Sequence, residues 1–145
     1  GTSAEEAAKN TASMSSRRLL VVGHGPIGHA FIEQMVEQKA CFEISVLCEE
    51  PRPAYNRVML TQYFEDRDGH KGDSMKLSYW SECQLKESSV KLVYGRAVEI
   101  DRKAKQVVYT SPGGTDGPAR LNYDVLVMAT GSYCFVPPTP AMVLP

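Results

Sequence analysis

Three glycines placed directly after a short apolar run constrain this chain more than any other feature of its sequence. Leu19 to Val22 is a run of four apolar residues, which is typical of a strand buried on both faces. The run leads into Gly23-x-Gly25-x-x-Gly28 and then into a pattern with helical spacing. A strand, a glycine-rich turn and a helix in this order predict the start of a dinucleotide-binding βαβ unit. The alternative is a glycine-rich turn that binds nothing.

Each residue of this turn has its own physical reason to be there. Gly23 permits the tight turn out of the strand, and Gly25 lets a pyrophosphate approach the backbone. Gly28 allows the helix to pack closely on the strand. Pro26 suits the first helical position, where its missing N–H costs no hydrogen bond, and Ile27 follows it. The helix N-terminus then offers free N–H groups to the phosphates, so these five residues form the predicted phosphate-binding turn.

A second strand and a pair of acids complete this unit. Ile27, Ala30, Phe31 and Met35 recur at helical spacing, and we expect them to cover one face of the sheet. The next apolar segment, 42–48, predicts a second strand that a right-handed crossover places parallel to the first.

Glu49 and Glu50 follow that strand, at the place where a dinucleotide fold holds the ribose of the adenosine half with an acid. The simpler interpretation is a solvated acidic pair at the end of a strand. Carboxylates would repel a 2′-phosphate, so the predicted ligand is FAD or NAD and not NADP. Arg57 is, from spacing alone, either a fork-shaped phosphate donor or an ordinary surface arginine.

The rest of the chain predicts short elements. A helix is expected near Asn56, and another is expected to carry Leu77, Trp80 and Leu85. A strand over 90–94 then precedes an antiparallel meander of three strands between 95 and 123.

The last strand, 124–129, ends in Ala129-Thr130-Gly131. The carboxyl end of a parallel strand lies on the ligand-binding edge of such a sheet, so these three residues are candidate cofactor contacts. The alternative is a turn that simply ends the strand.

No side chain is nominated as an acid–base catalyst. We interpret His24, His29 and His70 as ordinary solvated histidines, and we expect Tyr55 and Tyr133 to pack in the core rather than beside a cofactor.

Composition narrows the function classes. The chain is 43% hydrophobic and 23% charged with a net charge of −1, so no basic excess indicates nucleic acid. Its apolar runs are too short to span a bilayer. Its four cysteines form no C-x-x-C pair, which favours structural thiols in a reducing, cytoplasmic compartment over metal ligands. Residues 1–16 are small and polar and are expected to be a disordered leader.

The order of these elements resembles the FAD-binding half of glutathione-reductase-like pyridine nucleotide–disulphide oxidoreductases. The stretch from Glu49 to Arg57, with its acids, prolines and tyrosine, is similar to the signature of the ferredoxin and rubredoxin reductase branch. This resemblance implies that Glu49 and Glu50 hold the adenosine ribose and that Arg57 contacts the FAD pyrophosphate. It also implies that the backbone of Val98 meets the adenine.

After Arg57 the sequence departs from that branch, because it reads Val-Met-Leu-Thr-Gln and has no lysine there. This departure, together with Gly28-His29 and the segments 31–33 and 129–133, closely resembles the amino-terminal part of assimilatory NAD(P)H nitrite reductases. The resemblance extends from Arg18 to about residue 140.

The nitrite reductase resemblance implies an α/β, Rossmann-like FAD-binding domain, with a parallel sheet, helices and a three-stranded meander. Residues 17–145 would be its truncated amino-terminal segment. The parent enzyme would pass electrons from NAD(P)H through FAD towards siroheme and reduce nitrite to ammonia. The alternatives are the FAD segment of an NAD(P)H-dependent rubredoxin or ferredoxin reductase and a regulatory nucleotide-binding module.

The same resemblance places the NAD(P)H site, the siroheme and the 4Fe–4S cluster outside this chain. The implied partners are a dinucleotide cofactor and the remainder of the parent enzyme, which can be a homodimer. No metal ligand, nucleic acid or membrane is expected. The segment alone is expected to hold FAD weakly and to be inactive.

Overall fold

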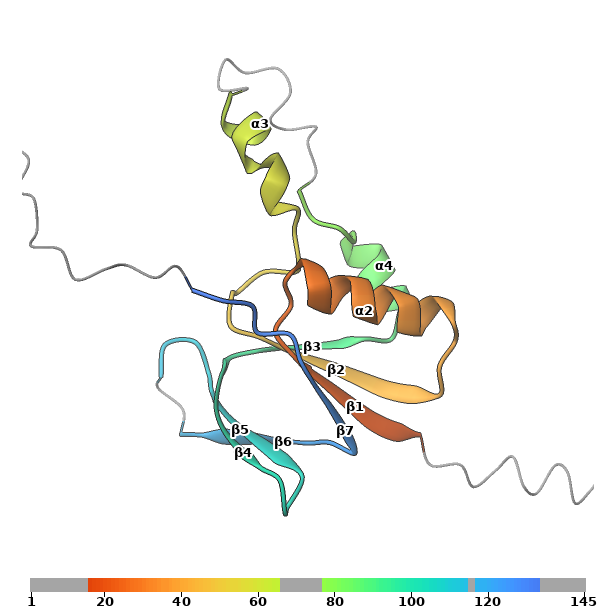
Figure 1. Cartoon of the computed structure of the whole chain (residues 1–145), viewed down its shortest axis with the longest axis vertical. Coiled ribbons are helices and arrows are strands. Elements are labelled where there is room, and N and C mark those ends of the chain that lie inside the picture. Colours follow the sequence, from red (N-terminus) through yellow and green to blue (C-terminus); the bar gives the residue numbers. More distant parts are fainter. Residues whose placement is uncertain (1–15, 66–76, 115–116, 134–145) are drawn as a thin grey trace, which may run out of the picture.

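The computed structural model of this chain describes residues 16–65, 77–114 and 117–133 (Figure 1). Nearly all of the predicted leader, His70 and the tail after residue 133 lie outside these ranges. Within them, no helix is long and apolar enough to cross a membrane.

The elements follow the predicted order. They are β1 (Arg17–Val22), α2 (Pro26–Glu37), β2 (Phe42–Cys48), the 3₁₀ turn η1 (Arg57–Met59), α3 (Leu60–Glu65), α4 (Glu82–Glu87), β3 (Lys91–Tyr94), β4 (Arg96–Asp101), β5 (Gln106–Thr110), β6 (Ala119–Asn122) and β7 (Val125–Met128).

Two sheets make up the fold. Strands β3, β2, β1 and β7 form a parallel sheet in that order, and β4, β5 and β6 form a separate antiparallel sheet. Figure 1 shows α2 on one side of the parallel sheet and the three-stranded sheet on the other. The predicted α/β class, the parallel βαβ unit and the meander are therefore confirmed.

The burial of β1 on both faces follows from this layering. Leu19 and Val21 pack with Ile32 of α2 in one apolar cluster. Leu20 and Val22 pack with Val107 of β5 in a second cluster, on the side of the antiparallel sheet. Side chains alternate along a strand, so a continuous apolar run is required when both faces are covered.

Strand β7 is held beside β1 at its first residues. The backbone N–H of Arg18 and its guanidinium both donate to the carboxylate of Asp124, at 2.7 and 2.9 Å. The Arg18 guanidinium keeps the pKa of Asp124 below its usual range. The pairing sets the register in which β7 runs parallel to β1 and ends near the glycine-rich turn.

The predicted face of α2 was partly wrong. Ile27 and Ala30 are exposed, whereas Gly28, His29 and Ile32 are buried. A Cβ at Gly28 would overlap the carbonyl oxygen of Gly23, so the helix makes its closest approach to the sheet there. Residues four and seven or eight positions later then share that face. This rotation turns the first two apolar residues to the outside.

The second short helix was also predicted too long. Residues 77–79 are extended, because the N–H of Tyr79 donates to the carbonyl of Ala54 at 3.1 Å and Leu77 accepts from Asn56 at 2.8 Å. Helix α4 begins only after Ser81, whose hydroxyl and backbone N–H exchange hydrogen bonds with Gln84 in a capping box.

Candidate functional site

A cleft of about 670 Å³ opens at the carboxyl ends of the parallel strands. It is lined by the turn after β1, the segment after β2, the start of β4 and the segment after β7. Nine of the twelve predicted cofactor residues line this cleft: Gly23, Gly25, Pro26, Glu49, Glu50, Arg57, Ala129, Thr130 and Gly131. The other three, Ile27, Gly28 and Val98, do not line it.

The glycine-rich turn forms the floor of the cleft. Gly23 has a φ of +102°, and a Cβ there would overlap the carbonyl group of Ala129. Nothing lies within 4 Å of the position that a Cβ would take on Gly25, so this backbone faces open space. Pro26 is the first residue of α2, as predicted. The turn therefore presents exposed backbone and a helix N-terminus to the cleft, which is the arrangement that binds phosphates.

Two carboxylates and their partners lie along the neighbouring edge. Arg57 forms an ion pair with Glu50, while Arg96 lies 3.7 Å from a carboxylate oxygen of Glu49. The hydroxyl of Tyr133 donates to the other Glu49 oxygen at 3.1 Å. All of these side chains are substantially exposed. Both acids can exchange their present partners for the hydroxyls of a ligand at little cost, because exposed ion pairs are weak.

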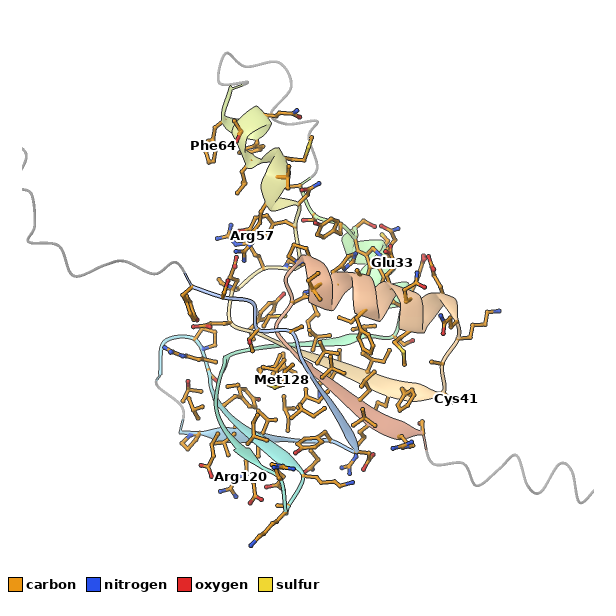
Figure 2. The ribbon with its side chains drawn as sticks, in the orientation of Figure 1. Glu33, Cys41, Arg57, Phe64, Arg120 and Met128 are labelled. Carbon is orange, nitrogen blue, oxygen red and sulfur yellow. The ribbon has the colours of Figure 1, made fainter. Side chains whose placement is uncertain are left out.

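Arg57 stands at the start of η1, and Figure 2 shows it at the foot of the segment that carries α3. Its guanidinium lies 5.5 Å from the centroid of the Tyr55 ring. Asn56 accepts a hydrogen bond from the N–H of Val58 at 3.1 Å and so caps this turn. The arginine therefore extends from an ordered turn beside the glycines, which is a placement suited to a phosphate donor.

Val98 lies one residue beyond the part of β4 that lines the cleft. The register of β4 against β5 shifts between Ala97 and Glu99, which places Val98 in a bulge. Its side chain is more than half exposed. Gly95, Arg96 and Ala97 are the residues of this segment that line the cleft.

The expectation of solvated histidines was wrong for two of them. His24 lines the cleft, and burial lowers its pKa to about 4. His29 is only 4% exposed, and burial lowers its pKa as well, against an opposing effect of Glu33. The ring of His29 stacks on Tyr79 at 4.7 Å and meets Trp80 edge-on at 4.9 Å. Segment 77–80 folds over α2 and buries the helix at this point.

Sequence reasoning also missed three side chains of the cleft. Tyr55 and Tyr133 were expected in the core but both line the cleft, and Tyr133 is 83% exposed. Arg96 was not considered. The preceding Gly95 is the local feature that could have indicated its position. The N–H of Gly95 donates to the carbonyl of Cys48 at 2.7 Å, which brings the start of β4 to the end of β2.

Among the described cysteines, Cys48 has the surroundings of a structural thiol. Cys48 is buried at the end of β2, and burial together with the nearby Glu50 raises its pKa to about 12. Cys41 and Cys83 are exposed and unpaired with one another.

These residues fit the ADP half of a dinucleotide. The open backbone at Gly25 and the N-terminus of α2 suit the pyrophosphate, and Arg57 adds a positive charge beside them. The carboxylates of Glu49 and Glu50 suit the ribose hydroxyls. All of these groups converge on one cleft at the edge where α/β sheets bind ligands.

Comparison with known proteins agrees with this interpretation. The chain is 41% identical over 128 residues to the nitrite reductase (NADH) large subunit of Escherichia coli K12, covering 86% of this chain and 14% of that protein. It is 38% identical over 133 residues to the nitrite reductase [NAD(P)H] large subunit of Klebsiella oxytoca, covering 88% of this chain and 12% of that protein. The chain thus spans a small part of these relatives.

A solved structure shares the fold. The NAD-dependent persulfide reductase from A. fulgidus aligns with a TM-score of 0.68 and 25% identity, over 83% of this chain and 23% of that chain. The sequence profile of the pyridine nucleotide-disulphide oxidoreductases matches residues 17–144. The chain belongs to the pyridine nucleotide-disulphide oxidoreductase family.

Proposed function

We propose that this chain is the FAD-binding segment of a cytoplasmic, NAD(P)H-dependent nitrite reductase. The observation that carries the proposal is the convergence of the glycine-rich turn, two carboxylates and Arg57 on one cleft. The names of the nitrite reductase relatives support an NAD(P)H-dependent reduction of nitrite. In the proposed reaction, electrons pass from NAD(P)H through the flavin towards siroheme and nitrite becomes ammonia.

The residues of this chain bind and orient the cofactor. The backbone at Gly25 and the N-terminus of α2 hold the pyrophosphate together with Arg57. Glu49 and Glu50 accept hydrogen bonds from the ribose hydroxyls, while the segment around Val98 meets the adenine. A bound flavin supplies what protein side chains lack, the ability to accept a hydride and to release single electrons.

The segment after β7 gives the cofactor its second boundary. Ala129, Thr130 and Gly131 follow the strand next to β1, so this segment packs directly beside the glycine-rich turn and lines the cleft with it. Gly131 has a φ of +69°, which allows the chain to turn at this edge. The remainder of the parent enzyme would supply the nicotinamide site, the siroheme and the 4Fe–4S cluster.

Calorimetry with ADP and 2′-phospho-ADP tests the cofactor assignment. We expect the chain to bind ADP more tightly, because Glu49 and Glu50 repel the additional phosphate. A variant carrying Glu49→Gln and Glu50→Gln is the matched control and should lose most of this preference. Tighter binding of 2′-phospho-ADP to the unsubstituted chain would contradict the assignment.

The reaction itself is tested in the complete parent enzyme. Arg57→Ala should lower its flavin content and, in proportion, its NADH-dependent reduction of nitrite. Nitrite reduction that continues at the original rate in enzyme without flavin would contradict the proposal.

A further inference from the structure

His24 connects the glycine-rich turn to the segment that carries Arg57. It stands between Gly23 and Gly25, and its Nδ1 accepts a hydrogen bond from the backbone N–H of Ala54 at 3.2 Å. Ala54 is 3% exposed, so this N–H depends on a protein partner. A ring nitrogen that accepts a hydrogen bond carries no proton, and His24 is therefore neutral with its proton on Nε2.

The Ala54 segment is tied at a second point. The carbonyl of Ala54 accepts the N–H of Tyr79 at 3.1 Å, and the ring of Tyr79 stacks on His29. His29 belongs to α2, and its N–H donates to the carbonyl of Gly25 at 2.9 Å. The contacts thus form a closed circuit that starts at the turn, passes through residues 54 and 79, and returns along α2.

This circuit fixes the place from which Arg57 extends. Arg57 follows Ala54 by three residues, and Asn56 between them is held by hydrogen bonds to Leu77 and Val58. Little freedom remains in the backbone between the buried Ala54 and the start of η1. The distance between the Arg57 backbone and the N-terminus of α2 therefore depends on the His24–Ala54 hydrogen bond.

We propose that His24 is a positioning residue for the pyrophosphate, which holds Ala54 so that Arg57 and the N-terminus of α2 face the same phosphates. The proposal rests on the proposed function, because it assumes that a dinucleotide occupies the cleft. His24 acts through its acceptor nitrogen and not through a charge.

Amide hydrogen exchange in the ligand-free chain tests the link itself. His24→Leu removes the acceptor, whereas the Oδ1 of His24→Asn stands as many bonds from Cα as the histidine Nδ1 does. We expect the Ala54 amide to exchange about tenfold faster or more in His24→Leu and within about threefold of the original rate in His24→Asn. Unchanged exchange at Ala54 in His24→Leu would overturn the proposal.

His24→Gln provides a polar control. Its acceptor lies one bond further from the backbone, so it should fail to protect Ala54 although it suits the partly buried site better than leucine. If His24→Leu does not fold, the comparison of Gln with Asn decides: equal protection of Ala54 in these two variants would overturn the proposal.

Binding of ADP tests the positioning role. We expect His24→Leu to weaken ADP binding about tenfold, the effect of one hydrogen bond, and His24→Asn to restore it. In an Arg57→Ala background the same His24→Leu change should cost less than about twofold, because coupled residues are not additive. An equal loss in both backgrounds would show that His24 does not act through Arg57 and would overturn the proposal.

The two measurements separate this inference from the proposed function. If the unsubstituted chain binds no ADP, the proposed function and the positioning role both fail, while the exchange data still report on the His24–Ala54 bond. If ADP binds but the amide of Ala54 exchanges at the same rate in His24→Leu as in the original chain, only the positioning role fails.

Discussion

Replacing Gly28 with alanine should destabilise the fold whether or not a ligand is bound. Gly28 lies in the first turns of α2 and is buried. A Cβ added there would overlap the carbonyl oxygen of Gly23 and would lie 3.4 Å from the Cβ of Ala129. The overlapping atom belongs to the backbone of a tight turn, so it cannot rotate away as a side chain could.

Two opposing effects set the size of the loss. An alanine in a helix interior is favoured over glycine by about 1 kcal/mol. Forcing one additional carbon into a well-packed contact costs about 1–3 kcal/mol, and the upper end applies here because the neighbour is backbone. The free energy of unfolding should therefore fall by about 2 kcal/mol, and ADP binding should weaken as the turn shifts.

Urea denaturation followed by circular dichroism measures this loss, with Gly25→Ala as the matched control. Gly25 has a φ of −87° and no atom within 4 Å of its added Cβ. Alanine at that position should change the free energy of unfolding by less than about 1 kcal/mol. A Gly28→Ala variant as stable as the original chain would refute the claim that this glycine sets the distance between α2 and the sheet.

Three further predictions follow from the cleft. Gly25→Val should abolish ADP binding while the unfolding midpoint in urea stays nearly unchanged, since the branched side chain fills only the space that the pyrophosphate needs. Arg57→Ala should weaken ADP binding by about 1.5–3 kcal/mol and flatten its dependence on salt, both measured by calorimetry. The stability should fall by about 1.5 kcal/mol between pH 6.5 and pH 4, after halving for solvent screening, because the unfolded chain protonates His24 before the fold does. Urea titrations at both pH values should show a smaller loss in His24→Asn than in the original chain, and the loss that remains includes the contribution of His29, whose pKa burial also lowers.

The parts of the fold that local sequence determines could be predicted. A run of apolar residues at β1, three glycines and a proline at the first helical position together specify strand, turn and helix within about twenty residues. The acids after β2 line the cleft, as predicted from the common edge at which parallel strands end, while their role towards a ribose stays a prediction. Pro26 and Gly23 act at least in part through backbone conformation, which the local sequence can specify.

Features that depend on distant segments could not be predicted. The rotation of α2 follows from the contact of Gly28 with Gly23, and Ile27 fits the apolar pattern without being buried. His29 is buried by Tyr79 and Trp80, fifty residues further along the chain. The hydroxyl of Tyr133 reaches Glu49 only because β7 lies beside β1. In each case the position of the side chain depends on a contact that the neighbouring sequence does not specify.

The three glycines of the motif differ in what excludes a side chain at each position. At Gly23 the positive φ and the carbonyl of Ala129 both exclude a side chain, so β7 adds a second reason to the one that the turn supplies. At Gly28 the neighbouring backbone alone excludes it. At Gly25 neither conformation nor any protein atom within 4 Å excludes a side chain, so the proposed pyrophosphate is what would require glycine there. A glycine that the fold does not require, at the N-terminus of a helix and lining the cleft, therefore adds to the convergence of the turn, the carboxylates and Arg57 as an argument for the proposed phosphate-bearing ligand.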